Sequence, residues 1–205
     1  EHFHDSKVFE TLIPKICKIF RQENEELTGF ENEEILAEYQ IYKTPGYVYM
    51  KGNVQIYSAG KQAADISAFP EGIAVAVGSE EDTPDICPDQ TIDKVFTIEN
   101  LTSFYRFKQE HSLVIYLGGY HNHSRRNLLM QIYQKLPDAQ YYHFGDLDAG
   151  GFYILEHLKR KTGIPFQMFQ MDIETLKKYE DYAKPLTEND KKRLMQLEKM
   201  ELPDE

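Results

Sequence analysis

Residues 140–151 read QYYHFGDLDAGG, a β-type run followed by two acidic residues and then by two glycines. Successive side chains of an extended strand alternate between faces, so Asp146 and Asp148 are expected to project the same way. Two carboxylates that close repel each other unless a cation lies between them. A hard divalent ion such as Mg²⁺ takes oxygen ligands and retains water for chemistry, so this stretch favours a metal-dependent phosphodiester enzyme.

The sequence on both sides of this stretch alternates between strand and helix patterns. Short apolar runs predict strands at residues 95–98, 113–117 and 166–171, in addition to the run at 140–144. Apolar residues at helical spacing predict helices over about 124–136 and 150–161. This alternation predicts an α/β fold, with a parallel sheet of about four strands flanked by helices.

The first 92 residues show a different pattern of expected secondary structure. A helix is expected over residues 7–26, a β-hairpin with strands at 47–50 and 54–57, and a short strand at 73–77. Residues 78–92 are rich in Glu, Asp and Pro and are expected to form a linker or a surface loop. The predicted organisation is therefore a smaller α+β segment (1–92) that packs on the core, a catalytic core (93–185), and a charged C-terminal helix and tail (186–205).

Composition narrows the class of protein. With 205 residues, 41% of them hydrophobic and 13% aromatic, the chain is expected to fold around its own core. It contains no apolar run of the roughly 18 residues that a membrane span needs, and its two cysteines suit a reduced, cytoplasmic protein. The net charge of −11 indicates no general basic face, so contact with DNA would need a local patch, a bridging metal, or another domain or subunit.

A third acidic residue, Glu99, follows the predicted strand at 95–98. In open parallel sheets, functional groups gather at the carboxyl ends of the strands, so Glu99, Asp146 and Asp148 are expected to converge at one edge. Together they form a candidate site for one or two Mg²⁺ ions, and Glu99 can instead serve as the proton-transfer group. Taken singly, Glu99 is more simply explained as a polar residue at a strand-to-helix turn, and Asp-x-Asp is explained equally well as an ordinary loop.

These segments carry a resemblance to known families. VFTIEN (95–100) followed by FGDLD (144–148) is similar to the Toprim domain of topoisomerases, primases and several nucleases. More narrowly, IENLTSF (98–104), LGGY (117–120) and GDLDAGGFYIL (145–155) resemble the JetD C-terminal family, the nuclease subunits of Wadjet plasmid-defence systems, which are related to the topoisomerase VI A subunit. HDSK (4–7) and the pair Met171-Asp172 also resemble markers of that family.

The resemblance implies a DNA endonuclease that hydrolyses circular plasmid DNA with Mg²⁺, or with Mn²⁺ in its place. It implies catalytic and metal-binding roles for Glu99, Asp146 and Asp148, and SMC-like Wadjet subunits as partners. A second copy of the chain is left open as a partner, and no membrane is expected. The chain is expected to begin after the family's N-terminal DNA-contacting arms, which leaves independent activity open.

Accessory candidates lie near the same expected edge: Gly118, Gly119, His121, His123, Arg125, Arg126 and Asp172. The two histidines can contact a phosphate or a metal-bound water, although an ordinary polar loop explains them more simply. His111 and His143 also invite a catalytic or zinc role. The two arginines can meet DNA phosphates or form a solvated helix face. Asp172 can approach the metal or cap a helix that starts at the next residue.

Two other functions are compatible with the sequence. In a phosphohydrolase of the haloacid-dehalogenase type, the first Asp of Asp-x-Asp attacks phosphorus, but that motif is normally followed by Thr or Val rather than by AGG (149–151). A Toprim-like module without catalytic activity, acting as a scaffold or in DNA recognition, is the other alternative.

Overall fold

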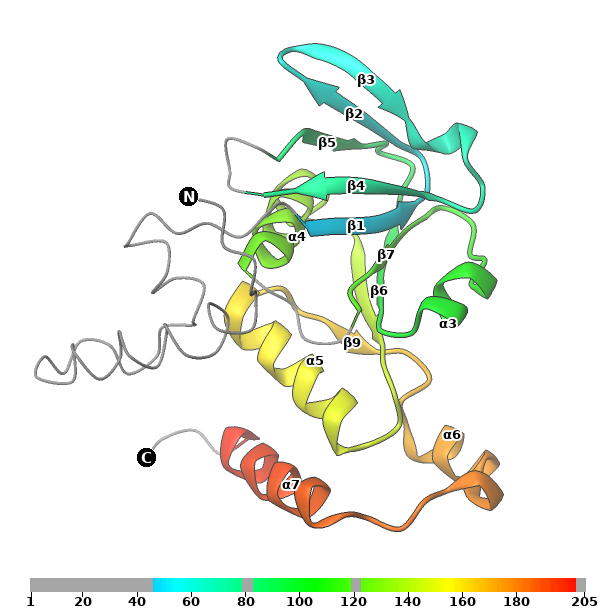
Figure 1. Cartoon of the computed structure of the whole chain (residues 1–205), viewed down its shortest axis with the longest axis vertical. Helices are drawn as coiled ribbons and strands as arrows, with labels where there is room; N and C mark the ends of the chain where they lie inside the picture. Colours follow the sequence, from blue (N-terminus) through cyan, green and yellow to red (C-terminus); the bar gives the residue numbers. More distant parts are fainter. Residues whose placement is uncertain (1–45, 79–82, 119–122, 202–205) are drawn as a thin grey trace, which may run out of the picture. The chain divides into compact units, whose positions relative to one another are not determined.

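The computed structural model describes residues 46–78, 83–118 and 123–201, which belong to one structural unit, Gly46–Glu205 (Figure 1). The helix predicted over 7–26 and the family-like segment 4–7 lie outside the described residues. Within the described ranges, no helix has both the length and the apolar character that a membrane span requires.

Six strands of the described residues form one mixed sheet in the order β4-β1-β7-β6-β8-β9. Its members are β1 (Gly46–Lys51), β4 (Ile73–Val77), β6 (Lys94–Ile98), β7 (Ser112–Tyr116), β8 (Gln140–Phe144) and β9 (Gln167–Met168). The four strands β7, β6, β8 and β9 pair in parallel, while β1 pairs antiparallel with β4 and β7. The predicted α/β class, with a parallel sheet of about four strands, is confirmed.

Strand β6 lies at the centre of the parallel part and is buried along residues 95–98. A strand covered on both faces needs apolar residues on both, which explains its continuous run VFTI. On one face lie α4 (His123–Lys135) and α5 (Ala149–Thr162), both within about two residues of the predicted helices. On the other face lies α3 (Leu101–Arg106), whose bounds were not predicted beyond a strand-to-helix turn at Glu99 (Figure 1).

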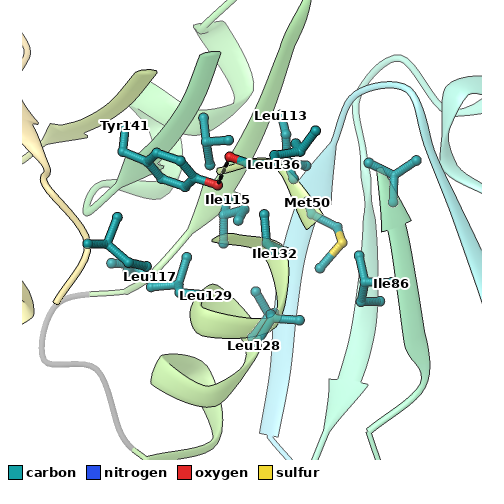
Figure 2. Packing of buried hydrophobic residues seen from close by; sticks show 14 of the residues in the cluster. Met50, Ile86, Leu113, Ile115, Leu117, Leu128, Leu129, Ile132, Leu136 and Tyr141 are labelled. Atoms are coloured by element: carbon teal, nitrogen blue, oxygen red, sulfur yellow. Dashed lines mark hydrogen bonds between the residues drawn. The ribbon is translucent and has the colours of Figure 1, made fainter. Parts of the chain in front are cut away.

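The larger core fills the space between the sheet and α4 (Figure 2). Leucines and isoleucines of the β7 region and of α4 meet there, all fully or almost fully buried: Leu113, Ile115, Leu117, Leu128, Leu129 and Ile132. The Tyr141 hydroxyl donates a hydrogen bond of 3.0 Å to the Leu136 carbonyl oxygen, just after α4. This bond satisfies the polar end of a buried aromatic ring and ties the end of α4 to β8.

Aromatic side chains dominate the opposite face. Phe96 of β6 stacks on Tyr142 of β8, with ring centroids 5.1 Å apart, and Phe104 of α3 is fully buried against this layer. The Lys51 ammonium donates a hydrogen bond of 2.6 Å to the Phe104 carbonyl oxygen near the end of α3. This contact fixes the short helix that follows Glu99, because a cation at a helix C-terminus compensates the partial negative charge there.

The predicted hairpin at 47–57 was wrong. Strand β2 (Val54–Ser58) leaves the main sheet and joins a second one, ordered β3-β2-β5, with β3 (Lys61–Asp65) and β5 (Asp85–Pro88). Gly52 between β1 and β2 has φ +141°, and a Cβ atom there would lie 2.5 Å from the Ser112 carbonyl oxygen. The glycine therefore serves a close crossing past β7 rather than a tight turn between paired strands.

The predicted linker at 78–92 was also wrong in its described part. Residues 85–88 form β5, which pairs antiparallel with β2, and Ile86 is 1% exposed. A strand of four residues with one buried aliphatic side chain, flanked by acids and prolines, gives too short an alternation to read from sequence.

The C-terminal part continues the α/β pattern. The strand predicted at 166–171 contains only the two paired residues of β9. Helix α6 (Ile173–Lys178), the 3-10 turn Glu180–Tyr182 and helix α7 (Glu188–Glu201) follow, and α7 lies beside α5 (Figure 1). A further 3-10 turn, Ile66–Ala68, follows β3.

Replacing Gly52 by alanine should destabilise the fold more than replacing Gly60 by alanine. Both glycines have positive φ, but a Cβ atom at Gly60 would meet no neighbour within 4 Å, whereas one at Gly52 would meet the Ser112 backbone. We expect a loss in the free energy of unfolding of about 1 kcal/mol for Gly60→Ala and about 3 kcal/mol or more for Gly52→Ala. Urea denaturation followed by circular dichroism measures both, and equal losses would contradict the close crossing.

Candidate functional site

The site begins with the parallel pairing of β6 and β8. Thr97 lies opposite His143 and Ile98 opposite Phe144, and the Glu99 N–H donates to the Phe144 carbonyl oxygen at 3.1 Å. Glu99 therefore leaves β6 directly beside Gly145. Its Oε2 atom accepts a hydrogen bond of 3.1 Å from the Asp146 backbone N–H, across 47 positions of sequence. The structure thus brings Glu99 and the start of the Asp-x-Asp segment together at the carboxyl edge of the sheet.

Glu99 sits in an environment that disfavours its negative charge. Its side chain is only 11% exposed, and burial raises the pKa of the carboxyl group. The hydrogen bond from the Asp146 N–H lowers this pKa in part, and the charges of Asp146 and Asp148 raise it further. The three carboxylates therefore act on one another electrostatically, and a cation among them would relieve that repulsion.

The two aspartates use their side chains differently. Asp148 is the N-cap of α5, and its Oδ1 accepts a hydrogen bond of 2.8 Å from the Gly151 N–H. Asp146 is exposed at the rim. Across residues 46–78, 83–118 and 123–201, no three His, Cys, Asp or Glu side chains are gathered closely enough to hold one metal ion. The oxygen donors and their mutual repulsion fit a hard divalent cation, and binding one jointly would require the three carboxylates to move closer together.

Two glycines make this close arrangement sterically possible. A Cβ atom at Gly145 would collide with Glu99 Oε2 and would lie 2.9 Å from His143 Nε2. A Cβ atom at Gly151 would collide with the Asp146 carbonyl oxygen. The absence of side chains at these two positions lets the Glu99 carboxylate and the first turn of α5 approach the Asp146 backbone.

A buried polar pair lies directly behind Glu99. Thr97 and His143 are both 0% exposed, and Thr97 Oγ1 lies 2.9 Å from His143 Nδ1. The other ring nitrogen, Nε2, has no hydrogen-bond partner among the described residues and lies 3.9 Å from Glu99 Oε2. Burial lowers the pKa of His143 to about 4, so the imidazole is neutral at neutral pH. Sequence reasoning singled out His143 but not Thr97, whose signal is its position opposite that histidine.

The remaining candidates divide between local structural contacts and undescribed positions. Asp172 caps α6, accepting a hydrogen bond of 2.7 Å from the Thr175 N–H, and this contact lowers the pKa of its carboxyl group. Arg125 donates from Nη1 to the Leu117 carbonyl oxygen at 2.6 Å, and Arg126 is only 3% exposed.

Gly118 has φ +66°, and His123 begins α4. Gly119 and His121 lie outside the described residues. His111 immediately precedes β7, at the opposite end of the strands from Glu99. Asn100, next to Glu99, caps α3 by accepting from the Thr102 N–H at 2.9 Å.

Comparison with known proteins shows which family the chain belongs to. A family model described as Wadjet protein JetD, C-terminal, matches residues 82–205. The chain belongs to this family. It is also 29% identical over 201 residues to Wadjet protein JetD of Bacillus cereus (strain Q1), an alignment that covers 95% of this chain and 48% of that protein. The chain thus spans about half the length of this relative, and Glu99, Asp146 and Asp148 all lie inside the matched region.

The capping role of Asp148 can be separated from its charge. Asp148→Ala removes the acceptor for the Gly151 N–H and should lower the free energy of unfolding by about 1 kcal/mol. Asp148→Asn keeps an oxygen that can accept the same hydrogen bond, so it should lower the free energy of unfolding by only a few tenths of a kcal/mol. Urea denaturation measures both variants, and an equally large loss in the asparagine variant would show that the cap is not what the aspartate contributes to stability.

Proposed function

We propose that this chain is the catalytic core of a metal-dependent DNA endonuclease that acts in a Wadjet-type plasmid-defence system. Membership of the JetD C-terminal family supports the Wadjet context. The observation that carries the nuclease assignment is the contact between Glu99 Oε2 and the Asp146 N–H, which joins the acidic ends of two parallel strands. A Toprim-type relationship to the topoisomerase VI A subunit is part of this proposal.

Glu99, Asp146 and Asp148 would hold Mg²⁺, or Mn²⁺ in its place, and the ion would stabilise the negative charge that develops when a phosphodiester is hydrolysed. The chain contributes orientation: the Asp146 N–H fixes one oxygen of Glu99, and burial limits the freedom of that side chain. The N-terminus of α5, which starts at Ala149, supplies backbone N–H groups at the same edge, where an anionic phosphate is favoured. With its raised pKa, Glu99 is also suited to carry a proton.

The proposed partners are circular plasmid DNA and the SMC-like subunits of a Wadjet complex, with a second copy of the chain as a further candidate, and the proposed location is the cytoplasm. A haloacid-dehalogenase-type phosphohydrolase is less well supported, because its Asp-x-Asp motif is normally followed by Thr or Val, whereas AGG (149–151) follows here. A scaffold without catalytic activity would use the same fold but would not depend on the three carboxylates.

The first test is plasmid cleavage by the full-length protein. We expect Mg²⁺ or Mn²⁺ to support nicking or cutting of supercoiled plasmid, and chelation by EDTA to stop it. Asp146→Asn, Asp148→Asn and Glu99→Gln should each lower the cleavage rate by at least ~100-fold, because each removes a charged oxygen ligand while preserving shape.

Asp138→Asn is a matched control, because Asp138 is exposed and lies at the opposite end of β8. Its cleavage rate should remain that of the parent. Undiminished cleavage by the Asp146 or Asp148 variants would refute the nuclease assignment.

Metal binding by the chain itself separates the alternatives. We expect electron paramagnetic resonance to detect Mn²⁺ bound to the parent chain, and Glu99→Gln to weaken that binding as Asp146→Asn does. A site that loses Mn²⁺ with the aspartate variants but not with Glu99→Gln would favour the dehalogenase-type alternative. Absence of Mn²⁺ binding in the parent would favour the scaffold.

A further inference from the structure

In the Thr97–His143 pair, the ring nitrogen that faces Glu99 has no hydrogen-bond partner among the described residues. His143 Nε2 is buried, carries no hydrogen bond within that part of the chain, and lies 3.9 Å from Glu99 Oε2. Buried polar atoms nearly always have a hydrogen-bond partner, so an unpaired nitrogen that faces a carboxylate needs an explanation, and a functional role is one. The 3.9 Å between the two atoms is longer than a hydrogen bond, so a bond between them requires the Glu99 side chain to move closer to the imidazole.

The Thr97 hydroxyl can determine which ring nitrogen carries the proton. Thr97 Oγ1 lies 2.9 Å from His143 Nδ1, and its hydroxyl can instead donate to the Tyr142 carbonyl oxygen, 3.2 Å away. In that second arrangement Oγ1 accepts from Nδ1–H and Nε2 carries no proton. When the hydroxyl donates to Nδ1, the ring proton sits on Nε2 and points at the Glu99 carboxylate. The opposite arrangement would turn a nitrogen lone pair toward carboxylate oxygens where little water can intervene, which is electrostatically unfavourable. The contact with the Tyr142 carbonyl oxygen is long for an O–H···O bond, and a carboxylate faces Nε2, so we take the Nε2–H tautomer as the favoured one.

We propose that His143 is a positioning residue that donates a hydrogen bond from Nε2–H to Glu99 Oε2. Oε2 already accepts from the Asp146 N–H, so two donors on one oxygen would leave Oε1 free to face a cation. Gly145 is needed for the same hydrogen bond, because a side chain at that position would crowd both Glu99 Oε2 and His143 Nε2. The benefit to a cation rests on the proposed function, whereas the hydrogen bond itself is a property of the chain alone.

Nuclear magnetic resonance of the chain, labelled with ¹⁵N at histidine, tests the hydrogen bond without any metal. We expect His143 as the neutral Nε2–H tautomer, with an Nε2 chemical shift that changes in Glu99→Leu and does not change in Asp138→Asn. An Nδ1–H tautomer, or a shift that ignores the Glu99 substitution, would overturn the inference. Because the parent chain is measured, this result stands even where a His143 variant fails to fold.

Mn²⁺ affinity, measured by electron paramagnetic resonance, tests the positioning role. His143→Leu should weaken Mn²⁺ binding ~10–100-fold, the usual cost of losing a group that orients a metal ligand. His143→Gln, which can present an N–H near the Nε2 position, should stay within about threefold of the parent. His111→Asn, at the other end of the sheet and at a positive φ that asparagine tolerates, is the control.

The outcomes separate this inference from the proposed function. Equal Mn²⁺ affinity in the parent and a folded His143→Leu would overturn the positioning role while leaving the metal site intact. Loss of affinity in His143→Gln as severe as in His143→Leu would also overturn it, since packing rather than donation would then matter. A parent that binds no Mn²⁺ would defeat the proposed function, and the tautomer measurement would then decide whether His143 holds Glu99.

Discussion

The parallel pairing of β6 with β8 is the interaction on which the candidate site depends. It sets Thr97 opposite His143 and continues past the end of β6, where the Glu99 N–H donates to the Phe144 carbonyl oxygen. Glu99 is thus bound to β8 and the residues after it through both its backbone and its side chain. A change of register by one residue would turn Glu99 to the aromatic face and remove it from Asp146.

The packing around this pairing keeps the acids close despite their repulsion. The leucine and isoleucine layer under α4 fixes one face, and the stacked Phe96 and Tyr142 rings fix the other. Thr97 and His143 form a fully buried polar pair within this sheet. Such a pair contributes less to stability than aliphatic residues of the same volume would, so its position directly behind Glu99 is better explained by the site than by the core.

The parts predicted from sequence were those with a strong local signal. The strands at β6, β7 and β8, and the helices α4 and α5, have clear apolar runs or helical spacing, and the rule that parallel strands present their carboxyl ends together placed Glu99 near Asp146. The hairpin and the linker were wrong because the partners of β2 and β5 are set by long-range pairing that leaves no local pattern. Neither the capping role of Asp148 nor the contact between Thr97 and His143 is visible in the sequence, since both depend on side-chain direction and strand register.

The acidic charge of the chain constrains how it could meet DNA under the proposed function. The chain carries a net charge of −11, and the candidate site adds three carboxylates at one edge, so a phosphodiester approaching that edge alone meets repulsion. Arg126 is buried, and Arg125 donates a hydrogen bond to the Leu117 carbonyl oxygen. These two basic residues, which follow β7 in the sequence, therefore make contacts within the fold. Under the proposed function, bound divalent cations must therefore offset the local negative charge before the phosphate can bind. One ion would reduce the formal charge of the three carboxylates without reversing it, and a second would be needed to make the edge positive. Metal dependence would then extend to DNA binding at this edge as well as to cleavage, and the burial of Glu99 would keep its carboxylate oriented toward the ion.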